Sequence, residues 1–556
     1  MHRPRRPRPR PALRPRTRPS TLGVRVTRVW TSAAGVEIRD LVPAALRRAW
    51  VARGHCPDRD LYTLFAGHVE AHPTRTAVVD PAGAVTYAQL DAEVRHIASR
   101  LAESGLGARD IIAVRVPNGR RAVAAELAVA ALGAVALPYP PGHGSRGPAS
   151  LLGRSRARAV IVENASDAVP EAFLPHLEAV FSWAEPTHPK GRSLAVPART
   201  PFRPSPVDPE APARILVSSG SEAEPKMVAY SHNAIAGGRA TYVRALACGD
   251  PGPMRNLVLV PLASSFGSLG APVTVAALGG TLLVQDSYDP RQALRTLTEH
   301  RPTHVFAVPT MLRRLAELPP PPGEDLSGLR ALVSSGAALP DATAAACRRR
   351  FGRPVITVYG SSDGVNCHTA ATGLSPGTGT GLPDPAVTDI RISGPTGEIQ
   401  ARGPMTPLCY VAAPDLDRRY RTPDGWVRTG DRGRLDARGR LHVLGRLRQI
   451  VVRGGYTISP AEVEQALGAH PAIAEAACVG VPDDELGERL CACVREAPGA
   501  PPLTLADLTG FLADRCGLER RKLPELLLRV PEMPLGPTGK VSRPALTRLA
   551  TAAAVR

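Results

Sequence analysis

Short apolar runs alternate with amphipathic stretches along most of the chain from residue 60 onward. Apolar runs at residues 111–118, 135–140 and 158–164 predict strands, and the helical spacing of apolar residues at 121–135 predicts a helix. Such alternation is typical of proteins in which helices connect largely parallel strands. The hydrophobic pattern therefore predicts an α/β fold.

Two proline-rich stretches, at residues 186–212 and 319–322, interrupt this pattern and predict surface loops. After residue 445 the alternation gives way to a shorter α+β pattern over residues 450–556, which is the size of a small mobile lid. We therefore expect a large domain followed by a small one.

The composition is that of a soluble globular protein, because 43% of the 556 residues are hydrophobic and 21% are charged. No run of about 18 apolar residues is present, so we expect no membrane-spanning helix. The nine cysteines are scattered without a CxxC pair, and no secretory signal is apparent. A reducing, cytoplasmic location is therefore expected.

The net charge of +19 is concentrated in part at the N-terminus, where residues 1–28 contain ten arginines and no acidic residue. A basic tail can bind nucleic acid or anionic lipid. However, its prolines prevent an amphipathic helix, and no aromatic residues are present to stack on bases. Nucleic-acid binding is therefore not expected, and we predict that the tail is dispensable for the chemistry.

Lysine is rare in this chain, because only four of the 69 basic residues are lysine. Arginine cannot replace lysine where a compact point charge must reach a phosphate. Two of the four lysines, Lys226 and Lys540, lie in motifs with other phosphate-binding features. These two residues are therefore candidates for functional positions.

The first motif is ILVSSGSEAEPKMVAYSHNAI at residues 215–235, which reads as a strand, a loop of small residues and a helix. Small residues let backbone N–H groups surround phosphate oxygens, and Lys226 adds positive charge. The motif lacks the GxxxxGK[ST] pattern, so P-loop chemistry is not implied. Taken alone, it could also be a serine-rich turn. The phosphate-binding candidates are Ser218, Ser219, Gly220, Ser221 and Lys226.

Three further motifs follow, and each has a binding interpretation. In VITVYGSSDGVNC at residues 355–367, Tyr359 could stack on a purine and Asp363 could hold Mg²⁺, although a hairpin turn with a solvated aspartate is the alternative. In residues 424–456, Asp431 could bind ribose hydroxyls and Arg446 could reach the ribose or the phosphates. The fourth motif, PLGPTGKVSRPAL at residues 534–546, presents Lys540 on a glycine turn.

In this order, the four motifs, together with LRALVSSGAALP and GEIQARGP, resemble the adenylate-forming (AMP-binding) superfamily. That superfamily comprises acyl-CoA and aryl-CoA synthetases, peptide-synthetase adenylation domains and beetle luciferases, and the chain looks most similar to stand-alone bacterial acid–CoA ligases. The resemblance covers about residues 61–546 and implies a large domain of αβ-layered sheets plus a distorted barrel, with a small mobile α+β lid. The implied segments are a partly disordered basic tail and lead-in (1–58), the AMP-binding domain (59–445), a hinge (446–448) and the lid (449–556).

The resemblance also implies roles for individual residues. Lys540 would bridge the attacking carboxylate and the α-phosphate, Lys226 and the loop before it would cover the outer phosphates, and Asp363 would stand where the family has a magnesium-binding glutamate. Arg448 would be the hinge residue, and a loop with Gly454 and Gly455 would approach the acceptor thiol. The implied nucleotide-binding residues are Ser218, Ser219, Gly220, Ser221, Gly336, Ala337, Ala338, Tyr359, Gly360, Ser361, Ser362, Asp431 and Arg446.

The acid pocket is expected among residues 233–239, 264–266, 334–337 and 364–368. The candidates are Ser264, Ser265, Phe266, Ser335 and Asn366. An α-amino acid is a poor candidate because Ser265 stands near the position where amino-acid-activating members carry an aspartate. An aromatic or cyclic acid is preferred over a long fatty acid.

The function implied by the resemblance is an ATP- and Mg²⁺-dependent acid–CoA ligase of bacterial secondary metabolism, with CoA as co-substrate. Three alternatives remain open: an acyl-AMP ligase that loads a carrier protein in trans, a ligase that activates nitrite for reaction with an aryl amine, and a non-catalytic nucleotide-binding regulator or nucleic-acid binder. The altered phosphate loop, with Glu222 and Ala223, leaves room for the nitrite reaction. The sequence does not identify the acid, the acceptor or the oligomeric state.

Overall fold

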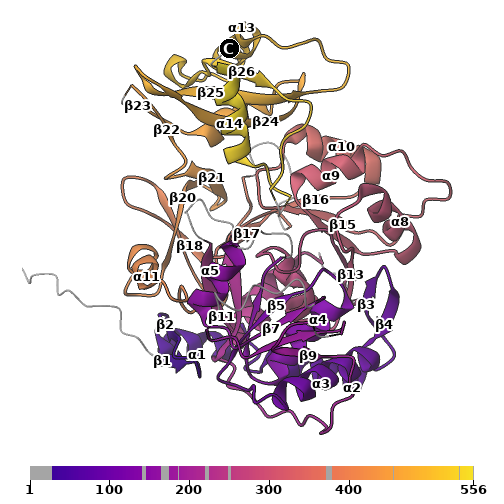
Figure 1. The fold of residues 1–556 in the computed structure, drawn as a ribbon. Helices are drawn as coiled ribbons and strands as arrows, with labels where there is room; N and C mark the ends of the chain where they lie inside the picture. The colour runs from indigo at the N-terminus through magenta and orange to yellow at the C-terminus, as the bar shows by residue number, and fades with distance from the viewer. Residues whose placement is uncertain are drawn as a thin grey trace, which may run out of the picture.

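In the computed structural model, the described residues are 28–140, 146–164, 175–185, 187–218, 225–247, 252–370, 379–454, 456–536 and 539–554. They form a large domain that is covered at one end by a smaller C-terminal lid (Figure 1). Within these ranges, no helix is long and apolar enough to cross a bilayer.

The large domain contains two mainly parallel sheets. The first has the strand order β11-β10-β6-β5-β7-β8-β9, in which only the pair β10/β11 is antiparallel. These strands are β5 (Ile111–Arg115), β6 (Val135–Pro138), β7 (Ala159–Val162), β8 (Ala179–Ser182), β9 (Gly191–Ser193), β10 (Pro212–Ser218) and β11 (Lys226–Ser231). The three strands predicted from the apolar runs are thus confirmed as β5, β6 and β7.

The second sheet has the order β17-β16-β15-β14-β12-β13-β3-β4, with an antiparallel pair at each edge. Its strands are β3 (Thr76–Asp80), β4 (Gly83–Thr86), β12 (Arg255–Val258), β13 (Thr281–Val284), β14 (His304–Ala307), β15 (Ala331–Ser335), β16 (Val355–Gly360) and β17 (Asn366–His368). The inner strands β12 to β15 are almost completely buried because helices cover both faces of a parallel sheet.

Helices cover these sheets, and one of them, α4, is buried along most of its length. The predicted helix at 121–135 is confirmed as α4, but it ends at Ala131 rather than at residue 135, because Gly133 turns the chain with a φ of 68° and β6 starts at Val135. All residues of α4 from Ala122 to Ala131 are buried. The helices of this domain are α1 (Ala44–Ala52), α2 (Leu61–Ala71), α3 (Tyr87–Ala102), α4 (Arg120–Ala131), α5 (Arg146–Ser155), α6 (His232–Ala234), η3 (Ile235–Arg239), α7 (Ala240–Ala245), η4 (Gly267–Leu269), η5 (Gly270–Ala277), α8 (Pro290–His300), α9 (Pro309–Ala316), α10 (Asp341–Phe351) and α11 (Pro414–Tyr420).

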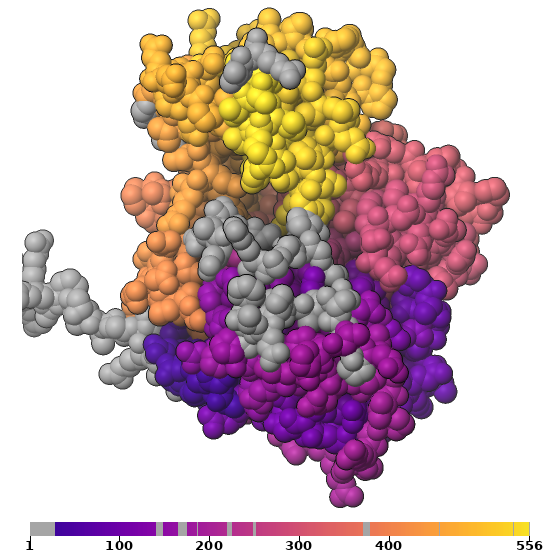
Figure 2. Space-filling view, viewed as in Figure 1, coloured from indigo at the N-terminus to yellow at the C-terminus, as the bar shows by residue number. Residues whose placement is uncertain are grey.

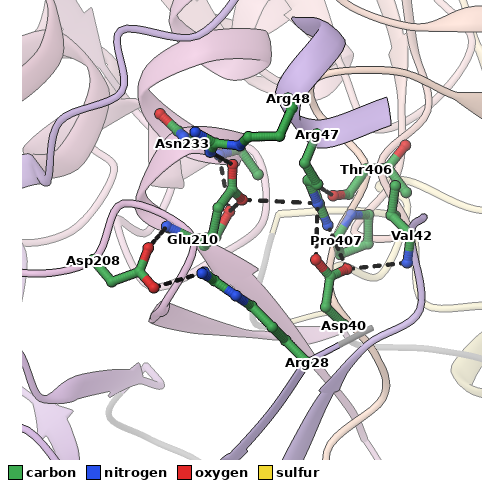
Figure 3. A network of polar contacts seen from close by, with 12 residues as sticks. Arg28, Asp40, Val42, Arg47, Arg48, Asp208, Glu210, Asn233, Thr406 and Pro407 are labelled. Atoms are coloured by element: carbon green, nitrogen blue, oxygen red, sulfur yellow. Dashed lines mark hydrogen bonds and ion pairs between the residues drawn. The ribbon is translucent and has the colours of Figure 1, made fainter. Parts of the chain in front are cut away.

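The lead-in to the large domain is anchored by buried charges. Residues 28–58 include the hairpin of β1 (Arg28–Thr31) and β2 (Glu37–Asp40), followed by α1. Arg47 of α1 is buried and binds both carboxylate oxygens of Asp40 at 3.0 and 3.1 Å (Figure 3). Arg48 contacts Glu210 at 3.3 Å, and Glu210 in turn accepts a 2.8 Å hydrogen bond from Asn233 at the start of the helix after β11. The lead-in therefore fixes one end of that helix.

Two further sheets complete the molecule, of which the first is antiparallel and the second has one parallel pair, β25/β26. A four-stranded sheet precedes the C-terminal domain and consists of β18 (Asp389–Ser393), β19 (Glu398–Arg402), β20 (Val427–Leu435) and β21 (Leu441–Arg446). The lid contains β22 (Val451–Arg453), β23 (Tyr456–Ile458), β24 (Ile473–Asp483), β25 (Gly487–Glu496) and β26 (Leu526–Arg529), with α12 (Pro460–Leu467), α13 (Leu505–Gly510), η6 (Phe511–Arg515), η7 (Arg520–Lys522) and α14 (Arg543–Ala554). In Figure 2 the lid, in orange and yellow, rests on the rose-coloured part of the large domain.

Candidate active site

The lid presents Lys540 to the large domain on a tight turn. The N–H of Gly536 donates to the carbonyl of Lys540 at 2.7 Å, which closes the turn. Thr310, at the start of α9, donates its hydroxyl to the carbonyl of Gly539 at 3.0 Å. A β-carbon on Gly539 would lie 2.8 Å from Cε of Met311. The turn is therefore held against α9 by a hydrogen bond and by close packing.

Lys540 lies directly against Gly336, the residue that follows β15. A β-carbon on Gly336 would stand 2.8 Å from Cε and 3.5 Å from Nζ of Lys540. Gly336 also has a φ of 92°, which glycine adopts without strain. The surrounding protein desolvates the ammonium group and lowers the pKa of Lys540, and the charge of Arg446 lowers this pKa further, although the side chain keeps one side open to solvent.

Asp431 and Arg446 are paired across two neighbouring strands. They are direct partners in the register of β20 and β21, and Nε of Arg446 lies 3.2 Å from Oδ1 of Asp431. The hydroxyl of Tyr359 donates to Oδ2 of Asp431 at 2.7 Å. Burial raises the pKa of Asp431, whereas Arg446 and the Tyr359 hydroxyl act in the opposite direction. Asp431 thus contacts two other predicted residues, Tyr359 and Arg446.

Asp363 and Lys226 are connected by two tyrosines that we did not predict. The hydroxyl of Tyr410 donates to Oδ1 of Asp363 at 2.6 Å. The ammonium nitrogen of Lys226 lies 4.1 Å from the ring centre of Tyr420 and 5.8 Å from that of Tyr410, which are cation–π distances. Tyr410 reaches this position because it bridges to Val228 of β11. No local sequence pattern indicates this contact, because it joins segments that are far apart in the chain.

The carboxyl ends of β14, β15 and β16 meet at one edge of the second sheet, where ligands bind in open α/β sheets. Ala337 and Ala338, which follow Gly336, are exposed there. Gly360 ends β16, the hydroxyl of Ser361 accepts from the N–H of Asp363 at 3.1 Å, and the carbonyl of Ser362 accepts from Tyr230 at 2.8 Å.

The phosphate loop is described only at its two ends. Ser218 and Lys226 are direct partners in the β10/β11 hairpin, so the two ends of the loop face each other. Ser219, Gly220, Ser221, Glu222 and Ala223 lie outside the described residues.

The predicted acid-pocket residues occupy a turn and the edge of the second sheet. Ser264 accepts from the N–H of Gly267 at 2.9 Å, so its hydroxyl closes the turn after β12. The ring of Phe266 packs edge-on against Phe306 with centroids 6.1 Å apart. The predicted residues on the sheet edge are the buried Ser335 and Asn366.

The hinge and thiol-loop candidates lie on the other side of the lid connection. The guanidinium carbon of Arg448 lies 6.0 Å from the ring centre of Tyr420. Gly454 forms the β22/β23 turn with a φ of 53° and donates its N–H to the carbonyl of Leu486 at 2.7 Å. Gly455 lies outside the described residues. In Figure 1 this hairpin is at the outer side of the lid, away from α9, so this lid position presents Lys540 to the large domain.

Charged residues hold the lid in this position. Arg313 of α9 forms an ion pair with Glu475 of β24, and both side chains are buried. Arg314 contacts Glu532 at 3.0 Å, and Arg495 of β25 contacts Glu317 at 3.4 Å. These pairs all connect residues after β14 with the lid.

The donor set at Asp363 fits a magnesium ion that is also bound by phosphate. Mg²⁺ commonly takes one or two carboxylates, with phosphate oxygens and water as the other ligands. Oδ1 of Asp363 accepts the Tyr410 hydroxyl, which leaves Oδ2 for a cation. Nowhere in the described ranges do three or more His, Cys, Asp or Glu side chains converge as a protein-only metal site. Asp363 alone is therefore compatible with a nucleotide-bound ion.

Comparisons with known proteins agree with this geometry. Residues 65–411 match the AMP-binding enzyme family, and residues 462–540 match the AMP-binding enzyme C-terminal domain. The chain is 29% identical over 543 residues to the 2-hydroxy-7-methoxy-5-methyl-1-naphthoate–CoA ligase of Streptomyces carzinostaticus, covering 91% of this chain and 95% of that protein. It is 29% identical over 542 residues to the salicyl-AMP ligase/salicyl-S-ArCP synthetase of Mycobacterium tuberculosis, covering 91% and 93%.

A solved structure supports the same assignment. The amide bond synthetase McbA from Marinactinospora thermotolerans superposes with a TM-score of 0.75 at 29% identity, covering 88% of this chain and 99% of that one. The expected α/β fold, with a large domain and a small C-terminal domain, is thereby confirmed. The chain therefore belongs to the AMP-binding enzyme family and is an adenylate-forming ligase of the acid–thiol ligase class.

Proposed function

We propose that this protein is an ATP-dependent acid–CoA ligase that acts on an aromatic or cyclic carboxylic acid. The contact of Lys540 with Gly336 is the observation that carries the proposal, because it puts a mobile ammonium group at the sheet edge where the nucleotide is expected. In the first step, a carboxylate oxygen attacks the α-phosphorus of ATP and pyrophosphate leaves. In the second step, the CoA thiol attacks the acyl carbon and AMP leaves.

The residues of the site fit distinct roles in the first step. The ammonium group of Lys540 stabilises the negative charge that builds up on the α-phosphate and the entering carboxylate. Asp431, oriented by the Tyr359 hydroxyl and by Arg446, accepts hydrogen bonds from the ribose. Lys226 neutralises the outer phosphates, and Asp363 would hold the magnesium ion that shields their charge.

Two observations support an aromatic or cyclic acid. The half-buried ring of Phe266 lies in the turn at residues 264–268 and packs against the buried Phe306, so Phe266 offers an aromatic surface beside that turn. Two similar proteins are named for a naphthoate and for salicylate. The identity of the acid is left open by the 29% identity to these proteins.

The remaining candidate functions differ in the molecule that accepts the activated acyl group. Similar proteins are named for CoA ligation, for loading an aryl carrier protein and for amide bond synthesis, so each acceptor is tested directly. Purified protein is incubated with ATP, Mg²⁺ and a panel of aryl and cyclic acids, fatty acids and nitrite. Each mixture is divided into portions without acceptor, with CoA, with a phosphopantetheinylated carrier protein and with an aryl amine, and the release of AMP and the acyl product are measured.

We expect AMP release with an aryl or cyclic acid and a thioester only in the presence of CoA. A thioester formed only on the carrier protein would show that the acceptor is a carrier protein in trans rather than CoA. Activity with nitrite and an aryl amine, but with no carboxylate, would refute the proposal. Absence of AMP release with every acid would also refute it.

A further inference from the structure

Arg239, at the end of the π-helical turn η3, carries a buried charge that is not used by the proposed reaction. The residue is 3% exposed. Its Nη1 donates to the carbonyl of Ser265 at 3.2 Å and to the hydroxyl of Ser268 at 2.8 Å, and its Nη2 donates to the hydroxyl of Tyr230 at 3.3 Å. All three hydrogen-bond partners are neutral, and the guanidinium carbon lies 4.8 Å from the ring centre of Tyr230, which is a cation–π distance. Nε has no partner among the described residues.

Glu126, a buried carboxylate of the same domain, is paired with another arginine. Glu126 of α4 forms its ion pair with Arg214 of β10, and Arg214 also donates to the carbonyl of Leu262 at 2.8 Å. Burial lowers the pKa of Arg214, and the charge of Arg239 contributes in the same direction, so the two guanidinium groups are close enough to repel each other. In the part of the chain that the structure describes, no carboxylate lies within ion-pair distance of Arg239.

The helix that carries Arg239 cannot easily rotate to move this guanidinium group away from that of Arg214. A β-carbon on Gly237 would lie 2.7 Å from Sγ of Cys56, and one on Gly238 would lie 2.3 Å from the backbone nitrogen of Met405. The helix is therefore wedged between two segments by glycines that allow close approach. Single π-helical turns are rare and occur frequently at functional sites. These features fix the guanidinium group against the turn at residues 265–268.

The ring of Tyr230 and the three hydrogen bonds give the guanidinium group neutral partners but no anion. The three hydrogen bonds go to neutral oxygens, and a neutral side chain could supply equivalent donors. An isolated buried charge is unfavourable unless an anion accompanies it. Arginine is also the side chain that best matches carboxylate and sulfonate geometry, because its planar fork donates two parallel hydrogen bonds.

We propose that Arg239 binds a second acidic group on the acid that this enzyme activates, so that the preferred substrates are dianionic acids carrying an additional carboxylate or sulfonate. This inference rests on the proposed function, because it places the acid at the turn of residues 264–268. The carboxylate that becomes adenylated is directed toward Lys540, and the second acidic group neutralises Arg239. Substrate selection therefore depends on charge as well as on shape.

The test compares acids that differ only in this charge. Isophthalate is matched with 3-carbamoylbenzoate, and 3-sulfobenzoate is matched with 3-sulfamoylbenzoate. The value of kcat/KM for ATP-dependent AMP release is measured for wild type, Arg239→Gln, Arg239→Lys and the control Arg255→Gln. Arg255 is a suitable control because it also donates to backbone carbonyls, of His300 and Arg301, but lies at the start of β12, away from the turn.

We expect the wild type to prefer the dianionic member of at least one pair by about 10- to 100-fold, as for loss of a charge-assisted hydrogen bond. Arg239→Gln should abolish this preference while the KM for ATP and the melting temperature stay close to wild type, Arg239→Lys should restore part of it, and Arg255→Gln should keep it. If Arg239→Gln lowers kcat/KM equally for both members of every pair, Arg239 has only a structural role and the inference is overturned.

The remaining outcomes separate this inference from the proposed function. Equal use of both members of every pair by the wild type, or a preference for the monoanionic members, with normal AMP release, overturns the inference about Arg239 and leaves the acid ligase intact. Absence of AMP release with every acid overturns both. If Arg239→Gln is insoluble, the preference of the wild type and the partial preference of Arg239→Lys still decide the outcome.

Discussion

Lys540 of the lid and Gly336 of the large domain are in contact across the domain boundary, with room for no side chain on residue 336. Gly336→Ala adds a β-carbon 2.8 Å from Cε of Lys540 and forces alanine into a φ of 92°. Such backbone strain is worth about 1–3 kcal/mol. We expect the adenylation rate to fall at least about tenfold, because both strain and displacement of Lys540 act on the closed state. Gly352→Ala is the control, since its φ is 60° but its β-carbon meets open space. Equal rates for the two variants would contradict the role of this contact.

Lys540 itself should be needed for one half-reaction only. We expect Lys540→Gln to lower the adenylation rate by about 10²–10³, as for loss of one key charge stabiliser. Transfer from a supplied acyl-adenylate to CoA should be nearly unchanged, because Lys540 acts on pyrophosphate displacement. Lys522→Gln provides a matched lid lysine that pairs with Glu462. Single-turnover assays of each half-reaction make the measurement, and a similar loss in both would contradict the assignment.

The alkaline limb of the adenylation rate should report the ionisation of Lys540. The protonated amine is the active form, and its pKa is lowered by desolvation and by Arg446, so the rate falls as the pH rises through a value below the usual 10.4 or so for lysine. Bound phosphates raise this pKa again, so the limb of kcat should lie at higher pH than that of kcat/KM for ATP. Lys540→Arg stays charged throughout and should lose the limb even if its rate is lower. A limb that persists in this variant would assign it to another group.

The hydroxyl of Tyr359 should contribute to nucleotide affinity through Asp431. Tyr359→Phe removes the 2.7 Å hydrogen bond that orients this buried carboxylate. Loss of a hydrogen bond to a charged group is worth about 1.5–3 kcal/mol. We expect the KM for ATP to rise by about tenfold or more with a smaller change in kcat. Tyr288→Phe, which removes a 2.7 Å bond to the carbonyl of Met311, serves as the control for loss of a tyrosine hydroxyl.

The residues that the sequence identified are those whose chemistry lies in short motifs. Lys540, Asp431, Tyr359 and Asp363 could be found because each lies at or next to a strand end or a glycine. The structure brings Tyr359 and Arg446 into contact with Asp431 and places Lys540 against Gly336. Their roles in binding and catalysis remain predictions.

The contacts that the sequence did not reveal depend on pairing between distant segments. Tyr410 and Tyr420 join Lys226 to Asp363 only because residue 410 bridges to β11. Arg239 lay inside an expected acid-pocket range, but its lack of a counterion depends on Glu126 being taken by Arg214. No periodicity encodes such partner choices, because they are decided by the packing of the completed core.

The ion pair between Arg313 and Glu475 should control the position of the lid rather than the stability of either domain. Both side chains are buried at the interface, and Arg495 adds a second positive charge 3.9 Å from Glu475. Glu475→Gln leaves only Glu317 to pair with the two arginines in the closed state, so we expect a cost below the about 3–5 kcal/mol of a fully broken buried pair. When the lid opens, the same groups become hydrated, so the penalty applies to closure. We therefore expect slower adenylation, near-normal transfer from a supplied acyl-adenylate and a melting temperature within a few degrees of wild type. Glu532→Gln, whose contact with Arg314 is exposed, should have little effect. A large drop in melting temperature for Glu475→Gln, with both half-reactions reduced alike, would instead make this pair a general stabilising contact.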